Sequence, residues 1–223
     1  MPGFDQDYWQ RHWREASAHR HGDSGGGAPN PYVVDETEGL TPGTALDAGC
    51  GTGAEAVWLA SRGWHVTAAD ISPEALARAA ERAANSEASD QVRWVEADLT
   101  TWAPDTRFDL VTTHYAHPAM PQTAFYDRIS GWVAPGGTLL IVGHLHTPHA
   151  TEHQHGHGHG HGHGHGHQPP AEASATLADI TALLDDAEWQ VVTAEEHVRT
   201  MDGRAAPLHD VVVRATRRRR GPG

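Results

Sequence analysis

A glycine-rich turn stands between a predicted strand and a predicted helix. The turn GCGTG at positions 49–53 follows the apolar strand Thr44–Ala48 and leads directly into a helix that begins at Ala54. Glycines permit a tight turn here, and they let the backbone lie against a ligand where a Cβ atom would collide with it. The turn alone is weak evidence for a nucleotide site, so its value depends on what the neighbouring strands carry.

Two carboxylates stand at the ends of the next two predicted strands. Asp70 follows the strand His65–Ala69, where its carboxylate can accept hydrogen bonds from both hydroxyls of a ribose. Asp98 follows the strand Val92–Glu96, where it can face the exocyclic amine of an adenine. Because the carboxyl ends of parallel strands meet at one edge of a sheet, the turn and the two carboxylates predict a site for one adenosine.

These segments resemble the motifs of the class I methyltransferases that use S-adenosylmethionine (SAM). LDAGCGTG is similar to the first motif of that family, AADIS to the second, EADL to the third, FDLVTTH to the fourth and APGGTLLIVGH to its strand-five segment. The resemblance covers residues 41–143 and implies SAM as the cofactor, with Asp47 helping to hold its ammonium group. DYWQRHW and WLASRGWHVTAADIS are further similar to bacterial small-molecule enzymes of the tellurite and thiopurine methyltransferase type.

The resemblance implies a set of cofactor-binding residues at the carboxyl ends of the first four strands. Within the glycine turn, a small side chain is needed beside the ligand, and nothing near the single cysteine marks it as a nucleophile. The expected cofactor-binding residues are Asp47, Gly49, Cys50, Gly51, Gly53, Asp70, Ile71, Ala97, Asp98, Leu99, Thr113 and His114.

A nicotinamide dehydrogenase is the nearest enzyme alternative. It also pairs a glycine-rich turn with an acidic residue about 20 positions further on. Its G-x-G-x-x-G fingerprint differs from the GxGxG of this chain, and Asp47 and Glu55 would repel a pyrophosphate at the start of the helix. The sequence therefore favours SAM over a dinucleotide.

Three histidines at strand ends are candidates for the pocket of the methyl acceptor. His114 and His117 follow the strand Leu110–Thr113, and His144 follows the strand Thr138–Gly143. Methyl transfer is an in-line displacement, so the protein supplies alignment, exclusion of water and at most a base. An imidazole titrates near neutrality, which makes His114 or His117 a candidate general base; a solvated or capping histidine is the alternative.

The fourth motif limits the methyl acceptor. TTHYAHP lacks the N-P-P-[YFW] sequence of the amino-methylating DNA and protein-glutamine enzymes of the resembled family. The chain also lacks the cysteine cluster of the arsenite methyltransferases, since Cys50 is its single cysteine. A small-molecule acceptor is expected, with sulfur, selenium, tellurium, oxygen and nitrogen all open.

A histidine-glycine tract, HQHGHGHGHGHGHGHQ, spans residues 153–168. Alternation with glycine places successive imidazoles on one side of an extended chain, so affinity for Ni²⁺, Cu²⁺ or Zn²⁺ is expected. A silent insertion, a metal store or sensor, and a lid near the acceptor pocket remain alternatives, and a non-catalytic metal-binding protein on a methyltransferase fold is the alternative function. The candidate metal ligands are His153, His155, His157, His159, His161, His163, His165 and His167.

Composition excludes several classes of function. The 223-residue chain has a formal net charge of -13, which argues against a nucleic-acid surface spread over the whole domain. It contains no lysine, which excludes a Schiff-base or P-loop lysine. One cysteine excludes an internal disulfide framework, and a reducing, cytoplasmic setting is expected. Neither a secretory signal nor an apolar run of roughly 20 residues is present, so no membrane association is expected.

Short apolar runs alternate with helical periodicity and predict an α/β protein. We expect a Rossmann-like, doubly wound, seven-stranded, mostly parallel sheet with an antiparallel C-terminal strand and helices on both faces. Two further strands are predicted at 190–195 and 209–215. Helices are predicted at 7–18, 54–62, 73–84 (with Ser72 as N-cap and Pro73 at the first helical position), 123–132 (halted by the Pro-Gly-Gly at 135–137) and 174–186.

One domain, 1–223, is expected for the whole chain. Trp9 and Trp13 belong either to a lid over the cofactor or to an ordinary amphipathic helix. The expected parts are an N-terminal helix and linker (1–40), a SAM-binding core (41–143), a histidine-rich insertion (144–172), a C-terminal helix with two strands (173–216) and a basic tail (217–223).

Overall fold

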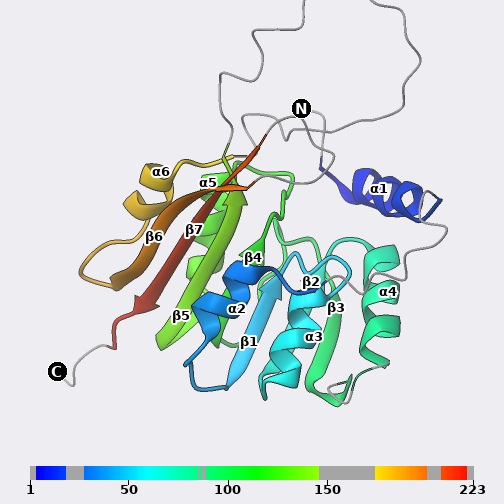
Figure 1. Cartoon of the computed structure of the whole chain (residues 1–223), viewed down its shortest axis with the longest axis horizontal. Helices are drawn as coiled ribbons and strands as arrows, with labels where there is room; N and C mark the ends of the chain where they lie inside the picture. The colour runs from blue at the N-terminus through cyan, green and yellow to red at the C-terminus, as the bar shows by residue number, and fades with distance from the viewer. Residues whose placement is uncertain are drawn as a thin grey trace, which may run out of the picture.

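Seven strands form a single sheet in the part of the chain that the computed structural model describes, residues 4–18, 28–84, 86, 89–145, 174–199 and 207–219. Their order is β3-β2-β1-β4-β5-β7-β6 (Figure 1). Strand β7 runs antiparallel to both neighbours, and every other neighbouring pair is parallel. The predicted sheet with one antiparallel C-terminal strand is confirmed. The histidine-glycine tract lies outside the described residues.

The elements alternate along the chain as predicted, and β1 and β3 have the expected bounds. The strands are β1 (Thr44–Ala48), β2 (His65–Asp70), β3 (Val92–Glu96), β4 (Phe108–His114), β5 (Val133–His144), β6 (Trp189–Arg199) and β7 (Leu208–Arg217). The helices are α1 (Gln6–Ala18), α2 (Pro31–Thr37), α3 (Ala54–Ser61), α4 (Pro73–Ala84), α5 (Gln122–Ser130) and α6 (Leu177–Ala182), with a 3-10 turn at Ser89–Gln91.

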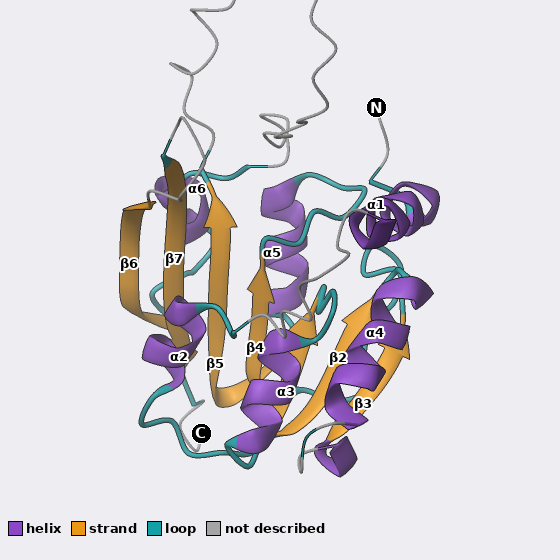
Figure 2. Ribbon diagram, turned by 45° about the vertical axis from the view of Figure 1, so that its right-hand side comes forward, coloured by secondary structure: helices purple, strands orange, loops and turns teal. Residues whose placement is uncertain are grey.

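Helices cover both faces of the sheet, which confirms the doubly wound architecture. Helices α2, α3 and α4 lie on one face and α5 and α6 on the other (Figure 2). Each face has its own apolar core: Leu59 and Val33 belong to the first, and Phe125 and Ile180 to the second. Burial on both faces explains why the central strands are nearly continuous apolar runs.

Strand β5 is longer than the sequence pattern predicts. Helix α5 ends at Ser130, and the Pro-Gly-Gly segment at 135–137 lies inside β5 instead of halting the helix. The pairing of β4 with β5 shifts register between Phe108 and Leu110. A Cβ atom on Gly137 would lie 2.9 Å from the carbonyl oxygen of Asp109. The glycines therefore allow an irregular strand start where the two backbones approach closely.

Two helices depart from the prediction. Helix α6 covers only 177–182 of the expected 174–186, because the Asp185 carboxylate accepts a hydrogen bond from the N–H of Ala187 and favours a turn. Helix α2 was not predicted, since its start falls in a segment rich in glycine and proline. Its local signal is Asn30-Pro31: the Asn30 side chain accepts from the N–H of Tyr32, and proline occupies the first turn.

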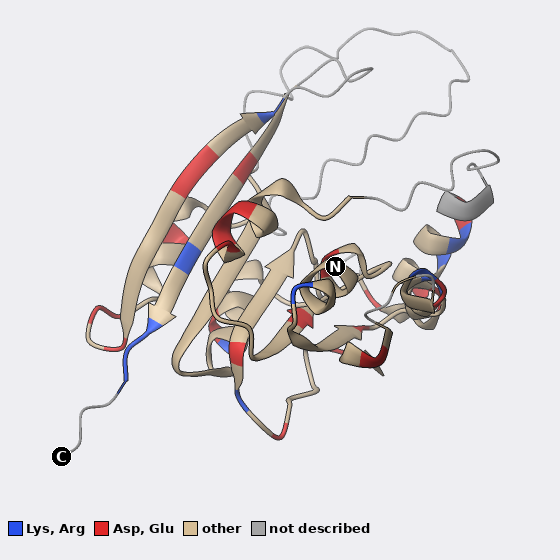
Figure 3. Cartoon of the chain, turned by 60° about the horizontal axis from the view of Figure 1, so that its bottom comes forward, with Lys and Arg blue, Asp and Glu red and all other residues tan. Residues whose placement is uncertain are grey.

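Acidic side chains are distributed over several elements, including helix α2 and strand β6 (Figure 3). This distribution agrees with the formal net charge of -13. Within the described residues, no helix combines the length and the apolar character that a membrane crossing requires.

Gly53→Ala tests whether the turn packs the first helix against its neighbours. Gly53 has φ +74, and a Cβ atom there would lie 2.6 Å from the ring of Trp94 and 2.8 Å from Cβ of Ala79. We expect Gly53→Ala to lower the free energy of unfolding by about 2–4 kcal/mol, combining backbone strain with overpacking. Gly39→Ala is the matched control, because Gly39 has φ +80 but nothing within 4 Å, and it should cost about 1 kcal/mol. Urea unfolding measures the free energy of unfolding of both variants. Equal decreases in the two variants would contradict the packing argument.

Candidate cofactor and acceptor site

The glycine turn between β1 and α3 is fixed to the neighbouring strand. The N–H groups of Gly49 and Cys50 both donate to the carbonyl oxygen of Ala69, at 2.8 and 3.0 Å. Gly49 and Gly51 have φ angles of +83 and +50, in the left-handed region that favours glycine. The turn therefore holds its backbone against the end of β2.

Asp70 links this turn to the end of β2. One carboxylate oxygen accepts the N–H of Gly51 at 2.8 Å, and the other accepts the N–H of Ser72 at 2.9 Å. Burial raises the pKa of Asp70, and the backbone hydrogen bonds act in the opposite direction. Each carboxylate oxygen has a second lone pair, so Asp70 retains capacity for two ligand hydroxyls.

Asp98 begins the turn after β3 and is exposed. One of its oxygens accepts hydrogen bonds from the N–H and the hydroxyl of Thr100, at 2.9 and 2.7 Å. These two bonds hold the carboxylate in a local turn. Its second oxygen is available to an exocyclic amine.

Asp47, Glu55 and His114 form a cluster behind the glycine turn. Their ligand atoms all lie within 4.8 Å of one another, and Asp47 is fully buried. Neither carboxylate oxygen of Asp47 has a hydrogen-bond partner among the described residues. Burial raises the pKa of Asp47 well above its ordinary value, and the charges of Glu55 and Asp70 add to this effect. A cation, either a metal ion or an ammonium group, would relieve this arrangement.

His114 is a neutral member of the cluster. Its Nε2 atom lies 2.6 Å from the hydroxyl of Thr112, and its Nδ1 atom lies 3.7 Å from a carboxylate oxygen of Asp47. Burial lowers the pKa of His114 to about 4, although the charge of Glu55 acts in the opposite direction. The imidazole therefore stays uncharged near neutrality.

A cavity of about 710 Å³ joins these groups at the carboxyl ends of the strands. It lies at the edge of the sheet where open α/β folds bind ligands. Its lining includes Gly49, Cys50, Gly51, Asp70, Ile71, Ala97, Asp98, Leu99, His114, Tyr115, His117 and His144.

Helix α1 contributes the wall that faces the sheet edge. Trp9, His12 and Trp13 line the cavity, and a Cβ atom on Gly51 would lie 3.2 Å from the ring of Trp13. The guanidinium of Arg78 donates to the carbonyl of Trp13 at 2.7 Å, which ties α1 to α4. Trp13 thus lies over the glycine turn, and Trp9 lines the same cavity.

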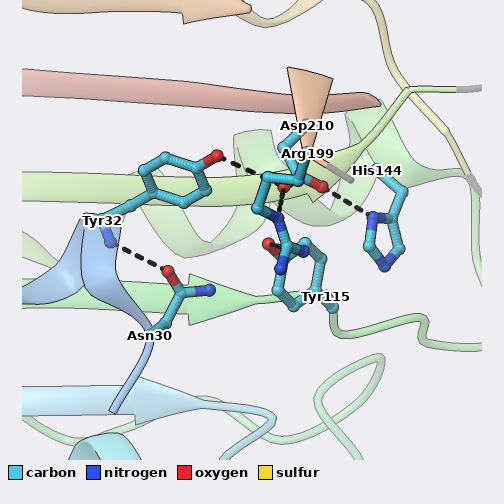
Figure 4. Close-up of polar contacts among 6 residues, drawn as sticks. All are labelled: Asn30, Tyr32, Tyr115, His144, Arg199 and Asp210. Atoms are coloured by element: carbon cyan, nitrogen blue, oxygen red, sulfur yellow. Dashed lines mark hydrogen bonds and ion pairs between the residues drawn. The ribbon is translucent and has the colours of Figure 1, made fainter. Parts of the chain in front are cut away.

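A polar network lies around Asp210, and two of its members, Tyr115 and His144, line the cavity (Figure 4). Nδ1 of His144 lies 2.9 Å from one carboxylate oxygen of the buried Asp210. Arg199 and Tyr32 donate to the other oxygen, and Arg199 also donates to the hydroxyl of Tyr115 at 3.1 Å. Side chains from α2, β5, β6, β7 and the loop after β4 meet here.

Residues 45–137 match the family described as "Methyltransferase domain". The matched segment, which holds the glycine turn, Asp70 and Asp98, is therefore similar to a methyltransferase domain. It is 43% identical over 100 residues to an uncharacterized methyltransferase of Mycobacterium tuberculosis, covering 44% of this chain and 48% of that protein. It is 35% identical over 144 residues to thiocyanate methyltransferase 1 of Arabidopsis thaliana, covering 63% of each. A probable thiol methyltransferase 2 of the same plant is 32% identical, covering 51% of this chain and 53% of that protein. The chain thus spans about half to under two thirds of these relatives.

Solved methyltransferases share the fold of the whole domain. Magnesium protoporphyrin IX methyltransferase from Synechocystis, solved with bound SAM, aligns with a TM-score of 0.63 at 17% identity, over 95% of this chain and 94% of that chain. The 1,6-didemethyltoxoflavin N1-methyltransferase from Burkholderia thailandensis, solved with S-adenosylhomocysteine, aligns with a TM-score of 0.61 at 20% identity, over 96% and 87%. The Rossmann-like methyltransferase fold predicted from the sequence is confirmed.

The methyltransferase domain brings most of the predicted site residues to one cavity. His114, His117 and His144, predicted for the acceptor pocket, all line it. Three of the predicted cofactor-binding residues do not: Asp47 is buried behind the turn, Gly53 faces α4 and β3, and the Thr113 hydroxyl donates to the carbonyl of Ala48. The alternation of side chains along β4 accounts for Thr113, because neighbouring residues point to opposite faces of a sheet.

Sequence reasoning missed four residues of the polar network around Asp210: Tyr32, Tyr115, Arg199 and Asp210 itself. Asp210 carries a recognisable signal, because a carboxylate precedes the apolar run VVV at 211–213 of a buried strand. Trp102, which follows Asp98 closely in the chain, packs edge-on against Trp132 with ring centroids 5.7 Å apart.

His114→Gln tests the neutral state of this histidine. Because burial lowers the pKa of folded His114 to about 4 from 6.5, the unfolded chain binds the proton more strongly, and stability falls as pH falls between these values. From about pH 7 to pH 5 the wild-type protein should lose about 2 kcal/mol more stability than the variant. Urea unfolding at the two pH values measures the difference. Identical pH dependence of the two proteins would show that His114 is protonated normally in the folded state.

Proposed function

We propose that this protein is a SAM-dependent methyltransferase that acts on a small molecule. The observation that carries the proposal is one cavity shared by the glycine turn, Asp70, Asp98 and a histidine-rich acceptor end. The methyltransferase relatives and the shared fold support it.

The residues present fit this cofactor. Asp70 would accept hydrogen bonds from the ribose hydroxyls and Asp98 from the adenine amine. Glu55, which lines the cavity, would accept the ammonium group, and the buried Asp47 behind it would add a second negative charge that favours this cation. When bound, SAM supplies a methyl group whose carbon is activated by a sulfonium.

The side chains around the cavity would align the acceptor and exclude water. Trp9 and Trp13 would cover the cofactor end, and Tyr115 and His144 would face the acceptor. Alignment and exclusion of water account for most of what a protein contributes to an in-line displacement. Sulfur is the favoured acceptor atom, because two relatives are named as thiol and thiocyanate methyltransferases.

Asp70→Ala tests the cofactor site. A hydrogen bond to a charged group contributes about 1.5–3 kcal/mol, so the variant should bind SAM and S-adenosylhomocysteine at least about 10-fold more weakly. Isothermal titration measures both ligands. Asp109→Ala is the matched control, since Asp109 anchors Thr44 at the opposite end of β1 and lies outside the cavity. The proposal would be contradicted if the wild-type protein bound neither ligand, or if Asp70→Ala bound them as tightly as the wild-type protein.

We also propose that the histidine-glycine tract binds Ni²⁺, Cu²⁺ or Zn²⁺ independently of methyl transfer. The support is its sequence, since imidazole is a good ligand for these ions and glycine lets the chain wrap around one.

Deletion of Glu152–Gln168 tests this independence. We expect the shortened chain to lose Ni²⁺ binding in isothermal titration, because it lacks the eight candidate ligands, while SAM binding and turnover are retained. Retained Ni²⁺ binding would contradict the metal assignment, and collapse of turnover would favour a lid function for the tract.

A further inference from the structure

We propose that His144 is the general base of the methyl transfer, that Asp210 positions it, and that the acceptor is a small thiol that loses its S–H proton. This inference rests on the proposed function, and it goes beyond it by assigning the proton acceptor and the protonation state of the substrate.

The His144–Asp210 contact fixes the tautomer of the imidazole. These residues lie opposite each other in the pairing of β5 with β7, and Nδ1 lies 2.9 Å from the carboxylate oxygen. A carboxylate only accepts hydrogen bonds, so Nδ1 carries the proton and Nε2 carries the lone pair. Among the described residues, no hydrogen bond to Nε2 of His144 is found, and the ring lines the cavity.

Asp210 is held in place from several sides. It is fully buried; one oxygen faces His144, and the other accepts from Arg199 and from the hydroxyl of Tyr32 at 3.4 Å. Burial acts to raise the pKa of Asp210, but the hydrogen bonds from His144 and Arg199 outweigh it, and the pKa is lowered. The carboxylate therefore stays ionised and can stabilise an imidazolium at His144.

Tyr115 orients the same imidazole from the loop after β4. Its ring stacks on His144 with centroids 4.1 Å apart and an interplanar angle of 21°. Tyr115 has φ +52, and among the described residues it is the non-glycine residue with a positive φ. Two hydrogen bonds stabilise this strained backbone conformation: the N–H of Tyr115 donates to the carbonyl of Val142, and its hydroxyl accepts from Arg199. Such strain is typical of functional positions.

His114 fits the role of base less well. Its Nε2 atom is engaged with the hydroxyl of Thr112, and burial lowers its pKa to about 4. An imidazole with that pKa is a weak acceptor for a proton at neutral pH. His144 combines an open nitrogen with a carboxylate partner and is the better base.

The chemistry of the base selects the acceptor. Imidazole is a moderate base, so it is better matched to a thiol than to a phenol, because thiols are the more acidic of the two. The other titratable groups at this end are Tyr32, Tyr115, Arg199 and Asp210. The rest of the cavity is lined by the titratable residues Tyr8, His12, Cys50, Glu55, Asp70, Asp98, His114 and His117.

The proposed step balances without an additional reagent. The thiol sulfur forms a bond to the methyl carbon as the bond from that carbon to the sulfonium sulfur breaks. The electron pair of the broken bond stays on the departing sulfur, which leaves in S-adenosylhomocysteine. The S–H proton moves to Nε2 of His144 and is later released to water.

Two aromatic thiols separate a base from a merely structural residue. At about pH 8, benzyl mercaptan carries its proton, whereas thiophenol is mostly ionised and needs no base. His144→Gln should lower turnover of benzyl mercaptan about 100-fold and that of thiophenol less than about 3-fold. Asp210→Asn should show the same selectivity with a loss of roughly 10-fold or more. His65→Gln, an exposed histidine at the opposite end of the sheet, should leave both rates unchanged.

Nitrogen NMR of the histidine rings gives a readout independent of turnover. With the metal ions removed by chelator, His144 should show the tautomer protonated at Nδ1, identified by the signals that His144→Gln lacks. Asp210→Asn should shift that population toward the other tautomer. The tautomer protonated at Nε2 in the wild-type protein would overturn the proposal.

The possible failures are distinguishable. Equal losses with the two thiols in His144→Gln overturn the base assignment, and no transfer to either thiol by the wild-type protein overturns the thiol class. In both cases, SAM binding measured by isothermal titration decides separately whether the proposed function stands.

Discussion

The hydrogen bond from the N–H of Gly51 to the carboxylate of Asp70 joins the glycine turn to the end of the neighbouring strand, and the cofactor end of the site depends on it. The same strand end binds the turn through Ala69 and accepts the N–H of Ala97 through the carbonyl of Asp70. Three loops are thereby held at one edge of the sheet. A ligand meets backbone groups whose positions were fixed when the sheet formed, so little ordering remains for binding.

Two buried carboxylates near this edge, Asp47 and Asp210, have opposite pKa shifts and different functions. No hydrogen-bond partner for the oxygens of Asp47 is found in the described part of the chain, and burial raises the pKa of Asp47, so it favours an incoming cation. Asp210 has three donors, its pKa is lowered, and it stays ionised to orient a histidine. The difference comes from the neighbours: Glu55 stands beside Asp47, and Arg199 stands beside Asp210. One fold thus provides both a cation site and a fixed negative charge, each buried behind residues that line the cavity.

Much of the fold followed from local sequence. The helix starts at Ala54 and Pro73 were predicted from a turn and an N-cap, and they are confirmed because such signals act within a few residues. Strand β5 and helix α6 were predicted less well. In β5, the glycines permit the close approach of β4 and do not end the element. In α6, the carboxylate of Asp185 favours a turn, so the helix ends early. Helix α2 was missed because its N-cap lies in a segment whose composition indicates a loop.

The sequence by itself determined how strands and helices alternate along the chain, where the glycine turn lies and which carboxylates follow strands. Each of these depends on residues close together in the chain. Only the tertiary structure decided that His144 meets Asp210, 66 positions later, and that Arg199 reaches Tyr115, 84 positions earlier. The reason is register: the antiparallel pairing of β5 with β7 places His144 opposite Asp210, and a slip of one residue would turn the side chains of the slipped strand to the other face.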